Sequence, residues 1–184
     1  IIKSIKKNCH VMVEKPVCLN IRELEKIKEK LKKKPKIRFS SNLVLRENTL
    51  FNEIKKKIKI KDVYNIEASY LWGRKHKLFK WRSKTKEYSL TLGATIHLLD
   101  LICWMLNSKP VSVFTKTNKK LTSKTKFKKF SFANYFFSFP NNISANLKAD
   151  AVCVHPHYHT IKIFEKKKTT ISDLNCQFEI KKQG

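Results

Sequence analysis

The stretch YSLTLGATIHLLDLICWMLN, residues 88–107, constrains the fold more than any other part of the chain. Its apolar side chains leave no broad polar face on a helix of about five turns, so the sequence predicts a helix buried in a core. The apolar helix expected within it, 89–106, is shorter than the roughly 20 predominantly apolar residues that cross a bilayer, and His97 and Asp100 interrupt it. We therefore expect a core helix and not a membrane span.

Two ionisable residues stand inside this apolar helix. His97 and Asp100 are spaced so that they share one helical face. Gly93 lies one turn before His97, and a glycine within a helix costs about 1 kcal/mol relative to alanine, which often marks a close approach of another group. Two interpretations stay open. Either His97 and Asp100 simply interact with each other in the core without any ligand, or His97 is an acid/base that Asp100 orients.

The N-terminal part of the chain predicts a strand, a helix and a second strand. HVMVEKP (10–16) is a strand with β-branched residues that ends in Glu-Lys-Pro. A helix follows from Asn20, with Glu23 at the position of a capping box, and Pro35 stops it. KIRFSSN (36–42) is the second strand. This order predicts a βαβ unit of a parallel sheet.

The pattern changes after residue 42. A short helix is expected at 48–58, and alternating apolar and polar residues then predict strands joined by short turns. The predicted strands are 62–73, 110–118, 129–139, 143–150, 157–165 and 169–176. The buried helix, at 89–106, would cover one face of their sheet. The expected fold class is α/β plus α+β, in which the end of a parallel βαβ domain precedes a mixed, mostly antiparallel sheet covered on one face by helices.

A formal net charge of +27 raises the question of a nucleic-acid partner. Of the 41 basic residues only five are arginine, the residue best suited to bidentate contacts with phosphates and bases. The lysines are scattered along helices, hairpins and turns, as a compositional bias would scatter them. We expect no specific nucleic-acid partner, but a non-catalytic basic module for nucleic acid or another polyanion stays open as the alternative function.

The five cysteines are odd in number and widely spaced, without a CxxC pair. This pattern is typical of reduced thiols in a cytoplasmic protein rather than of a disulfide framework or a zinc site. No signal peptide or transmembrane run is visible, so no membrane partner is expected. The chain begins without methionine and inside a predicted helix, which suggests a fragment.

Three histidines alternate in HPHYH, residues 155–159. In a strand, His155, His157 and His159 would share one face. Three imidazoles could bind Zn²⁺ or Cu²⁺, but no further acidic ligand is suitably placed, so we expect no metal. A substrate pocket or a structural role remains for them.

Three blocks of the sequence resemble the Gfo/Idh/MocA family, the glucose–fructose oxidoreductase and inositol dehydrogenase type of NAD(P)-dependent enzyme. They are HVMVEKPVCLNIRELEKI (10–27), WRSKTKEYSLTLGATIHLLDLICWML (81–106) and VCVHPHYHTIKIFEKKKTTI (152–171). They are similar to the EKP motif, the GxHxxD segment with its helix, and the strand pair beside the substrate pocket. The resemblance implies that residues 1–42 are the remnant of a Rossmann dinucleotide-binding domain. Residues 43–184 would be a substrate-binding and oligomerisation domain, truncated at its C-terminus.

The resemblance also implies a reaction, the transfer of a hydride between NAD or NADP and a sugar or nucleotide-sugar derivative, in a homo-oligomer. His97 would be the acid/base, because an imidazole titrates near neutral pH, and Asp100 would orient it. Lys15 would be a fixed cation that stabilises developing negative charge. Glu14, Lys15 and Pro16 would border the cofactor, with a cis bond between Lys15 and Pro16.

The resemblance further implies a substrate pocket lined by aromatic, basic and histidine side chains. The expected lining residues are Tyr70, Trp72, Arg74, His155, His157 and His159. Aromatic faces suit the C–H surfaces of sugars, and arginine suits an anionic group. Ordinary sheet packing of Tyr70 and Trp72 stays open, and Arg46 could either face a cleft or cap a helix.

The chain departs from the family pattern in ways that bear on catalysis. The pattern carries an aspartate one helical turn before the histidine, where this chain has Gly93, and a glycine two residues before it, where this chain has Thr95. Either this branch of the family works without that carboxylate, or catalysis is weakened or lost. The only glycines are Gly73, Gly93 and Gly184, so no Gly-rich dinucleotide fingerprint is present, and we expect residues 1–184 alone to be inactive.

Overall fold

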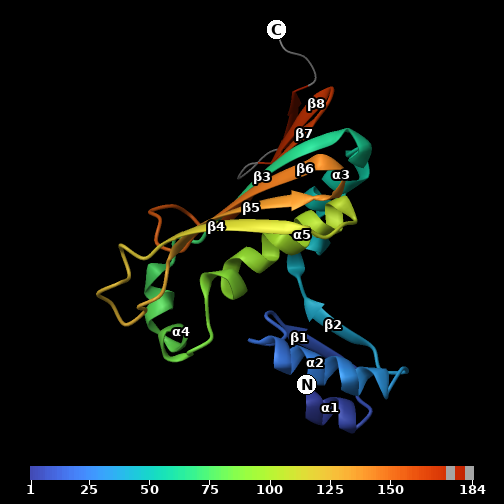
Figure 1. Cartoon of the computed structure of the whole chain (residues 1–184), viewed down its shortest axis with the longest axis vertical. Helices are drawn as coiled ribbons and strands as arrows, with labels where there is room; N and C mark the ends of the chain where they lie inside the picture. Colours follow the sequence, from blue (N-terminus) through green and yellow to red (C-terminus); the bar gives the residue numbers. More distant parts are fainter. Residues whose placement is uncertain (173–176, 181–184) are drawn as a thin grey trace. The chain divides into compact units, whose positions relative to one another are not determined.

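The computed structural model describes residues 1–172 and 177–180, which form two compact units. The first unit is Ile1–Val44 and the second is Leu45–Gly184. Figure 1 traces the elements of both, and each unit is described by itself.

The first unit is a parallel strand pair joined by a helix. Its elements are α1 (Ile2–Lys6), β1 (Val11–Glu14), α2 (Ile21–Lys32) and β2 (Phe39–Asn42). The two strands pair in parallel along their whole length, which confirms the predicted βαβ unit. Ile5 of α1 and Ile27 of α2 are its buried side chains.

Local sequence explains both ends of α2. The Asn20 side chain accepts a hydrogen bond of 3.0 Å from the backbone N–H of Glu23. The Glu23 carboxylate accepts one of 3.0 Å from the backbone N–H of Leu19, one residue before the partner that a capping box predicts. Pro35 lies in a turn after the helix, so β2 begins only at Phe39, later than the sequence predicts.

The second unit combines a mixed sheet with helices. Its helical elements are η1 (Val44–Glu47), α3 (Thr49–Lys57), η2 (Ile60–Asp62), η3 (Lys75–Phe79), α4 (Trp81–Lys84), η4 (Thr91–Thr95), α5 (Ile96–Leu106) and η5 (Pro140–Asn142). Its strands are β3 (Val63–Leu71), β4 (Ser112–Asn118), β5 (Phe132–Phe139), β6 (Ile143–Asp150), β7 (Tyr158–Glu165), β8 (Lys168–Ser172) and β9 (Gln177–Ile180). Among the described residues they form a seven-stranded sheet in the order β4-β5-β6-β3-β7-β8-β9.

The sheet is antiparallel except at one ladder. β3 and β6 run parallel, from Asn65↔Ser144 to Leu71↔Asp150, whereas every other neighbouring pair is antiparallel. This is the mixed, mostly antiparallel sheet that the sequence predicts. The last predicted strand, 169–176, is described only to Ser172, and residues 173–176 lie outside the described residues.

The core lies between one face of this sheet and its helices. The inward side chains of α5 are fully buried, as the apolar stretch predicts: Leu98, Leu101, Ile102 and Met105. They belong to the same hydrophobic cluster as Phe51 and Ile54 of α3 and the inward residues of β3. Across the described residues, no helix combines the length and the apolar character needed to cross a membrane.

The buried helix is not a uniform α-helix, which corrects the sequence prediction. Its first part, Thr91–Thr95, is a π-helical turn (η4), and the α-helix begins at Ile96. Single π-turns inserted before an α-helix are rare and occur frequently at functional sites. Gly93 lies in the middle of this turn.

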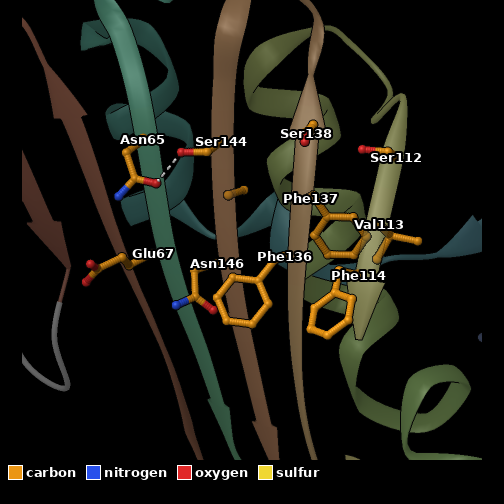
Figure 2. Close-up of a pocket in the computed structure, with 11 residues that line it drawn as sticks. Asn65, Glu67, Ser112, Val113, Phe114, Phe136, Phe137, Ser138, Ser144 and Asn146 are labelled. Carbon is orange, nitrogen blue, oxygen red and sulfur yellow. Dashed lines mark hydrogen bonds between the residues drawn. The ribbon is translucent and has the colours of Figure 1, made fainter. Parts of the chain in front are cut away.

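The other face of the sheet is lined by outward side chains of β3 to β6. We call this surface the open face; it includes Asn65, Glu67, Phe114, Phe136, Ser144 and Asn146. Figure 2 shows Phe114 and Phe136 side by side, with ring centroids 6.2 Å apart. Their exposures are 67% and 45%, high for phenylalanine, so the open face presents apolar surface to solvent.

Candidate active site

Tyr70 of β3 is the centre of a cluster of rings on the helix-covered side of the sheet. We call Tyr70, His97, His157 and His159 the histidine cluster. The Tyr70 ring lies parallel to that of His97, with centroids 6.1 Å apart, and edge to face with His159 at 4.5 Å and His157 at 5.4 Å. The Tyr70 hydroxyl and His157 Nε2 are hydrogen-bonded at 3.0 Å. Three imidazoles therefore meet at one tyrosine: His97 of α5, His159 of β7, and His157, which directly precedes β7.

The Tyr70 hydroxyl remains protonated near neutral pH. Burial, together with the nearby Tyr88, raises the pKa of Tyr70 to about 12, while Arg74 and Arg82 act in the opposite direction. A protonated phenol can donate a hydrogen bond to an oxygen or an imidazole nitrogen. Imidazole side chains commonly serve as general acids and bases in enzymes.

His155 does not join the cluster, contrary to the expected alternation. β7 begins at Tyr158, and Pro156 stands before it, so the strand geometry that would align three histidines covers only His159. The His155 ring packs on Tyr158, with centroids 4.6 Å apart, and its Nδ1 lies 2.9 Å from the Pro156 carbonyl. Among the described residues, no group of three or more His, Cys, Asp or Glu side chains is arranged to hold a metal ion.

A second ring cluster lies next to the first and is organised by Arg82 of α4. Its guanidinium lies over the rings of Trp81 at 4.5 Å, Trp72 at 5.1 Å and Tyr88 at 5.7 Å. Arg82 Nε also donates a hydrogen bond of 3.2 Å to the Tyr88 hydroxyl. Trp72 is buried in this contact, whereas Arg74 is half-buried. The sequence assigned no role to Arg82 or Tyr88; the WR pair that opens the second resembling block was the available signal.

Asp100 is bound by an arginine that the sequence left without a role. Arg46 Nε donates to Asp100 Oδ2 at 2.7 Å, and its terminal nitrogen donates to Asp100 Oδ1, so both carboxylate oxygens are engaged. This hydrogen bonding raises the pKa of Arg46. Of the two alternatives for Arg46, a cleft or a helix cap, neither describes this bidentate pair. The orientation of His97 by Asp100 stays a prediction, and it now involves Arg46.

Glu14, Lys15 and Pro16 lie where β1 of the first unit ends. The Glu14 carboxylate accepts a hydrogen bond of 2.5 Å from the Asn42 side chain, its neighbour in the parallel ladder. The Lys15–Pro16 peptide bond is cis, as predicted. The carboxyl end of parallel strands is the edge at which dinucleotides bind in open α/β sheets.

Comparison with known proteins places this arrangement in a family. Residues 52–170 match the family model described as the GFO/IDH/MocA C-terminal domain, and residues 1–42 match that of the oxidoreductase family with an NAD-binding Rossmann fold. The chain belongs to the GFO/IDH/MocA family. The resemblance drawn from the three sequence blocks is thereby confirmed, and the matched N-terminal model is one of NAD-binding domains. A comparison with proteins of curated function found no match.

Solved structures share the GFO/IDH/MocA fold of this chain at low sequence identity. Myo-inositol 2-dehydrogenase from Lactobacillus plantarum has a TM-score of 0.83 at 17% identity, over 97% of this chain and 52% of that one. Scyllo-inositol dehydrogenase from Lactobacillus casei, solved with NAD(H) and scyllo-inositol, has a TM-score of 0.78 at 16% identity, over 97% and 52%. UDP-N-acetylglucosamine 3-dehydrogenase from Acidithiobacillus ferrooxidans has a TM-score of 0.75 at 20% identity, over 93% of this chain and 52% of that one. The chain spans about half the length of these proteins.

Proposed function

We propose that the protein containing this chain transfers a hydride between NAD(P) and a sugar-like polyol or a nucleotide sugar. The observation that carries the proposal is the histidine cluster, which gathers proton-exchanging groups around one buried phenol in a domain of an oxidoreductase family. Oxidation of an alcohol carbon requires a base for the hydroxyl proton, and reduction requires an acid for the carbonyl oxygen.

His97 is the acid/base in this proposal. It lies half-buried on α5 with its ring parallel to that of Tyr70, and a rigid helix fixes its direction. When bound, the nicotinamide accepts or donates the hydride, and His97 takes or returns the proton of the same alcohol group. Tyr70, His157 and His159 are proposed to bind substrate hydroxyls as donors and acceptors.

The residues at the end of β1 fit the edge of a dinucleotide site. Glu14, Lys15 and Pro16 follow a parallel strand at its carboxyl end, and the Glu14 carboxylate is already fixed by Asn42. Following the family motif, we assign Lys15 the role of the fixed cation in the reaction. Residues 1–42 are then the end of the cofactor domain and residues 43–184 the substrate domain. The Gly-rich turn that holds the pyrophosphate is not among residues 1–184.

The position of Arg74 favours a substrate that carries an anionic group. It is half-buried and near enough to Tyr70 to lower the pKa of that hydroxyl. Its guanidinium forms no hydrogen bond or ion pair with any residue that the structure describes. Such a guanidinium can bind a carboxylate or a phosphate group, and a nucleotide sugar carries phosphate groups. Arg74→Gln should weaken binding of UDP-N-acetylglucosamine far more than binding of myo-inositol, whereas Arg22→Gln on the exposed side of α2 should change neither.

We also propose a cytoplasmic homo-oligomer formed through the open face (Figure 2). Exposed Phe114 and Phe136 support a second copy as the occupant, because apolar surface of this kind is otherwise left in water. Free thiols at the four cysteines that the structure describes agree with a reducing compartment. Phe114→Lys should lower the mass measured by light scattering, and an unchanged mass would exclude this face.

The proposed reaction is tested on the protein as its gene encodes it. NAD and NADP are offered with myo-inositol, scyllo-inositol and UDP-N-acetylglucosamine, and the nicotinamide absorbance is followed. Turnover of at least one pair that Lys15→Met and His97→Ala both reduce would support the proposal. Sequence-selective nucleic-acid binding at physiological salt without any turnover would favour the basic binding module instead.

A further inference from the structure

The side chain of Tyr88 occupies the space beside Gly93. A Cβ placed on Gly93 would lie 1.9 Å from the Tyr88 hydroxyl oxygen and 2.5 Å from Cζ of its ring. Cβ atoms essentially never approach another heavy atom within 3.0 Å. Residue 93 therefore has to be glycine while Tyr88 is in place, and the reason is space rather than backbone conformation.

Tyr88 is held in this position from several directions. It is 5% exposed, and Arg82 both donates to its hydroxyl at 3.2 Å and lies over its ring. The rings of Trp81 and Phe127 pack edge to face against it, with centroids at 5.5 Å and 6.2 Å. The Lys129 ammonium donates to its backbone carbonyl at 2.6 Å. Such a side chain is preorganised and has few other positions available.

The Tyr88 hydroxyl is also connected to the histidine cluster. Gly93 lies one helical turn before His97, so a group that fills the space at Gly93 lies on the face that His97 uses. His97 in turn lies with its ring parallel to that of Tyr70, which is hydrogen-bonded to His157. Arg82 therefore holds the Tyr88 hydroxyl beside the turn that leads into His97.

We propose that Tyr88, anchored by Arg82, is a positioning residue of the active site, and that its hydroxyl supplies the polar group that residue 93 cannot. At this place the family pattern has a carboxylate, and this chain has a neutral hydroxyl backed by a guanidinium. The turn before His97 therefore keeps a fixed hydrogen-bonding group without negative charge. The kinetic consequence rests on the proposed function.

Tyr88→Phe is the direct test, because it removes the hydroxyl and keeps the ring. Tyr135→Phe is the matched control: Tyr135 is equally buried, and its hydroxyl is bonded at 2.7 Å to Thr91 of the same π-turn. In the encoded protein, Tyr88→Phe should lower kcat about 10- to 100-fold, leave the KM for the cofactor within about twofold, and displace the pH profile of kcat. Tyr135→Phe should affect only Tm. Equal kinetics in the two variants would overturn the proposal.

A second measurement separates this proposal from the proposed reaction. The imidazole signals of ¹³C-histidine-labelled protein are followed by NMR across pH, without any substrate. Tyr88→Phe should displace the titration of His97, which lies one turn after Gly93, and Tyr135→Phe should not. If no variant turns over any polyol, the proposed reaction fails and the imidazole comparison decides the inference. Unchanged His97 signals in Tyr88→Phe would overturn it.

Discussion

Arg46 and Arg82 each hold a polar group beside the helix that carries His97, and they do so by different physical means. Arg46 binds both oxygens of Asp100, one turn after His97, in a pair whose side chains are 41% and 15% exposed. Arg82 donates one hydrogen bond to Tyr88, beside the turn that precedes His97, and one to the Lys77 carbonyl. Its guanidinium also lies over the rings of Trp72 and Trp81. One contact depends on opposite charges and the other on packing.

This difference decides how each contact responds to change. An ion pair at partial exposure is weakened by salt and contributes little net stability, because water competes for both charges. A guanidinium enclosed by tryptophan and tyrosine rings gains cation–π energy and covers apolar surface. The turn before His97, beside Tyr88, should therefore be more rigid than the turn after it, beside Asp100. Mutations there should also have larger effects on stability.

The largest expected effect on stability is that of Tyr88→Ala. Removing a buried aromatic side chain leaves a cavity against Trp81 and Phe127, so the free energy of unfolding should fall by about 3–5 kcal/mol. Urea denaturation of the encoded protein measures it. Tyr64→Ala, at a position 54% exposed, is the control and should cost much less. Equal losses at the two tyrosines would contradict the enclosure of Tyr88.

Gly93→Ala should cost less than Tyr88→Ala, about 1–3 kcal/mol, because the added methyl group forces the Tyr88 ring to move. The same change in a Tyr88→Ala background should cost less than half as much, since the obstructing ring is gone. Thermal denaturation of the four proteins of this cycle gives the coupling between the positions. Strictly additive losses would show that residues 88 and 93 do not share one space.

Asp100→Asn should have a smaller effect, about 1 kcal/mol or less. The amide keeps one acceptor for Arg46 but loses the charge, so the difference from wild type should shrink as sodium chloride is added. Arg82→Gln, the counterpart on the other side of His97, should show a loss that salt does not reduce. A salt-insensitive Asp100→Asn loss would mean that packing, not charge, holds Arg46.

The smallest expected effect is a dependence on alkaline pH. Burial raises the pKa of Tyr70 from its ordinary value near 10 to about 12, so the folded state holds this proton more tightly than the unfolded state. Its stabilising contribution is complete below about pH 10 and is lost as the pH rises toward 12. Tyr70→Phe should remove part of this decline in Tm, whereas Tyr64→Phe, at an exposed position, should leave it intact. An identical decline in all three proteins would contradict the enclosure of Tyr70.

The sequence predicted the parts of the fold that depend on local pattern. The apolar run before Asn107 and the strand, helix and strand around Asn20 are marked by periodicity and capping, which short stretches of chain determine. The π-turn at Gly93 was missed because neither periodicity nor a capping residue marks it in the sequence. The ring of Tyr88, which fills the space beside Gly93, packs against Phe127, a residue distant in the sequence. Histidine alternation failed at His155 because the strand begins after Pro156.

The candidate site likewise contains residues that sequence motifs predicted and residues that only the structure revealed. Tyr70, His97, His157 and His159 were named from motifs and meet at one point. Arg46 binds Asp100, a residue distant in the sequence, and Arg82 binds Tyr88 across a turn whose shape no motif encodes. Sequence spacing could therefore not predict either contact. Tertiary packing therefore supplies the anchoring residues, and local sequence supplies the groups they anchor.

The most direct test of the histidine cluster as a polyol redox site is kcat of His97→Ala in the encoded protein, measured beside NADH binding by calorimetry. Loss of the acid/base should reduce kcat about 10²- to 10⁴-fold, with the Kd for NADH unchanged, because the imidazole serves proton transfer and not cofactor binding. Full turnover by His97→Ala would contradict the assignment and remove the residue around which the site is described.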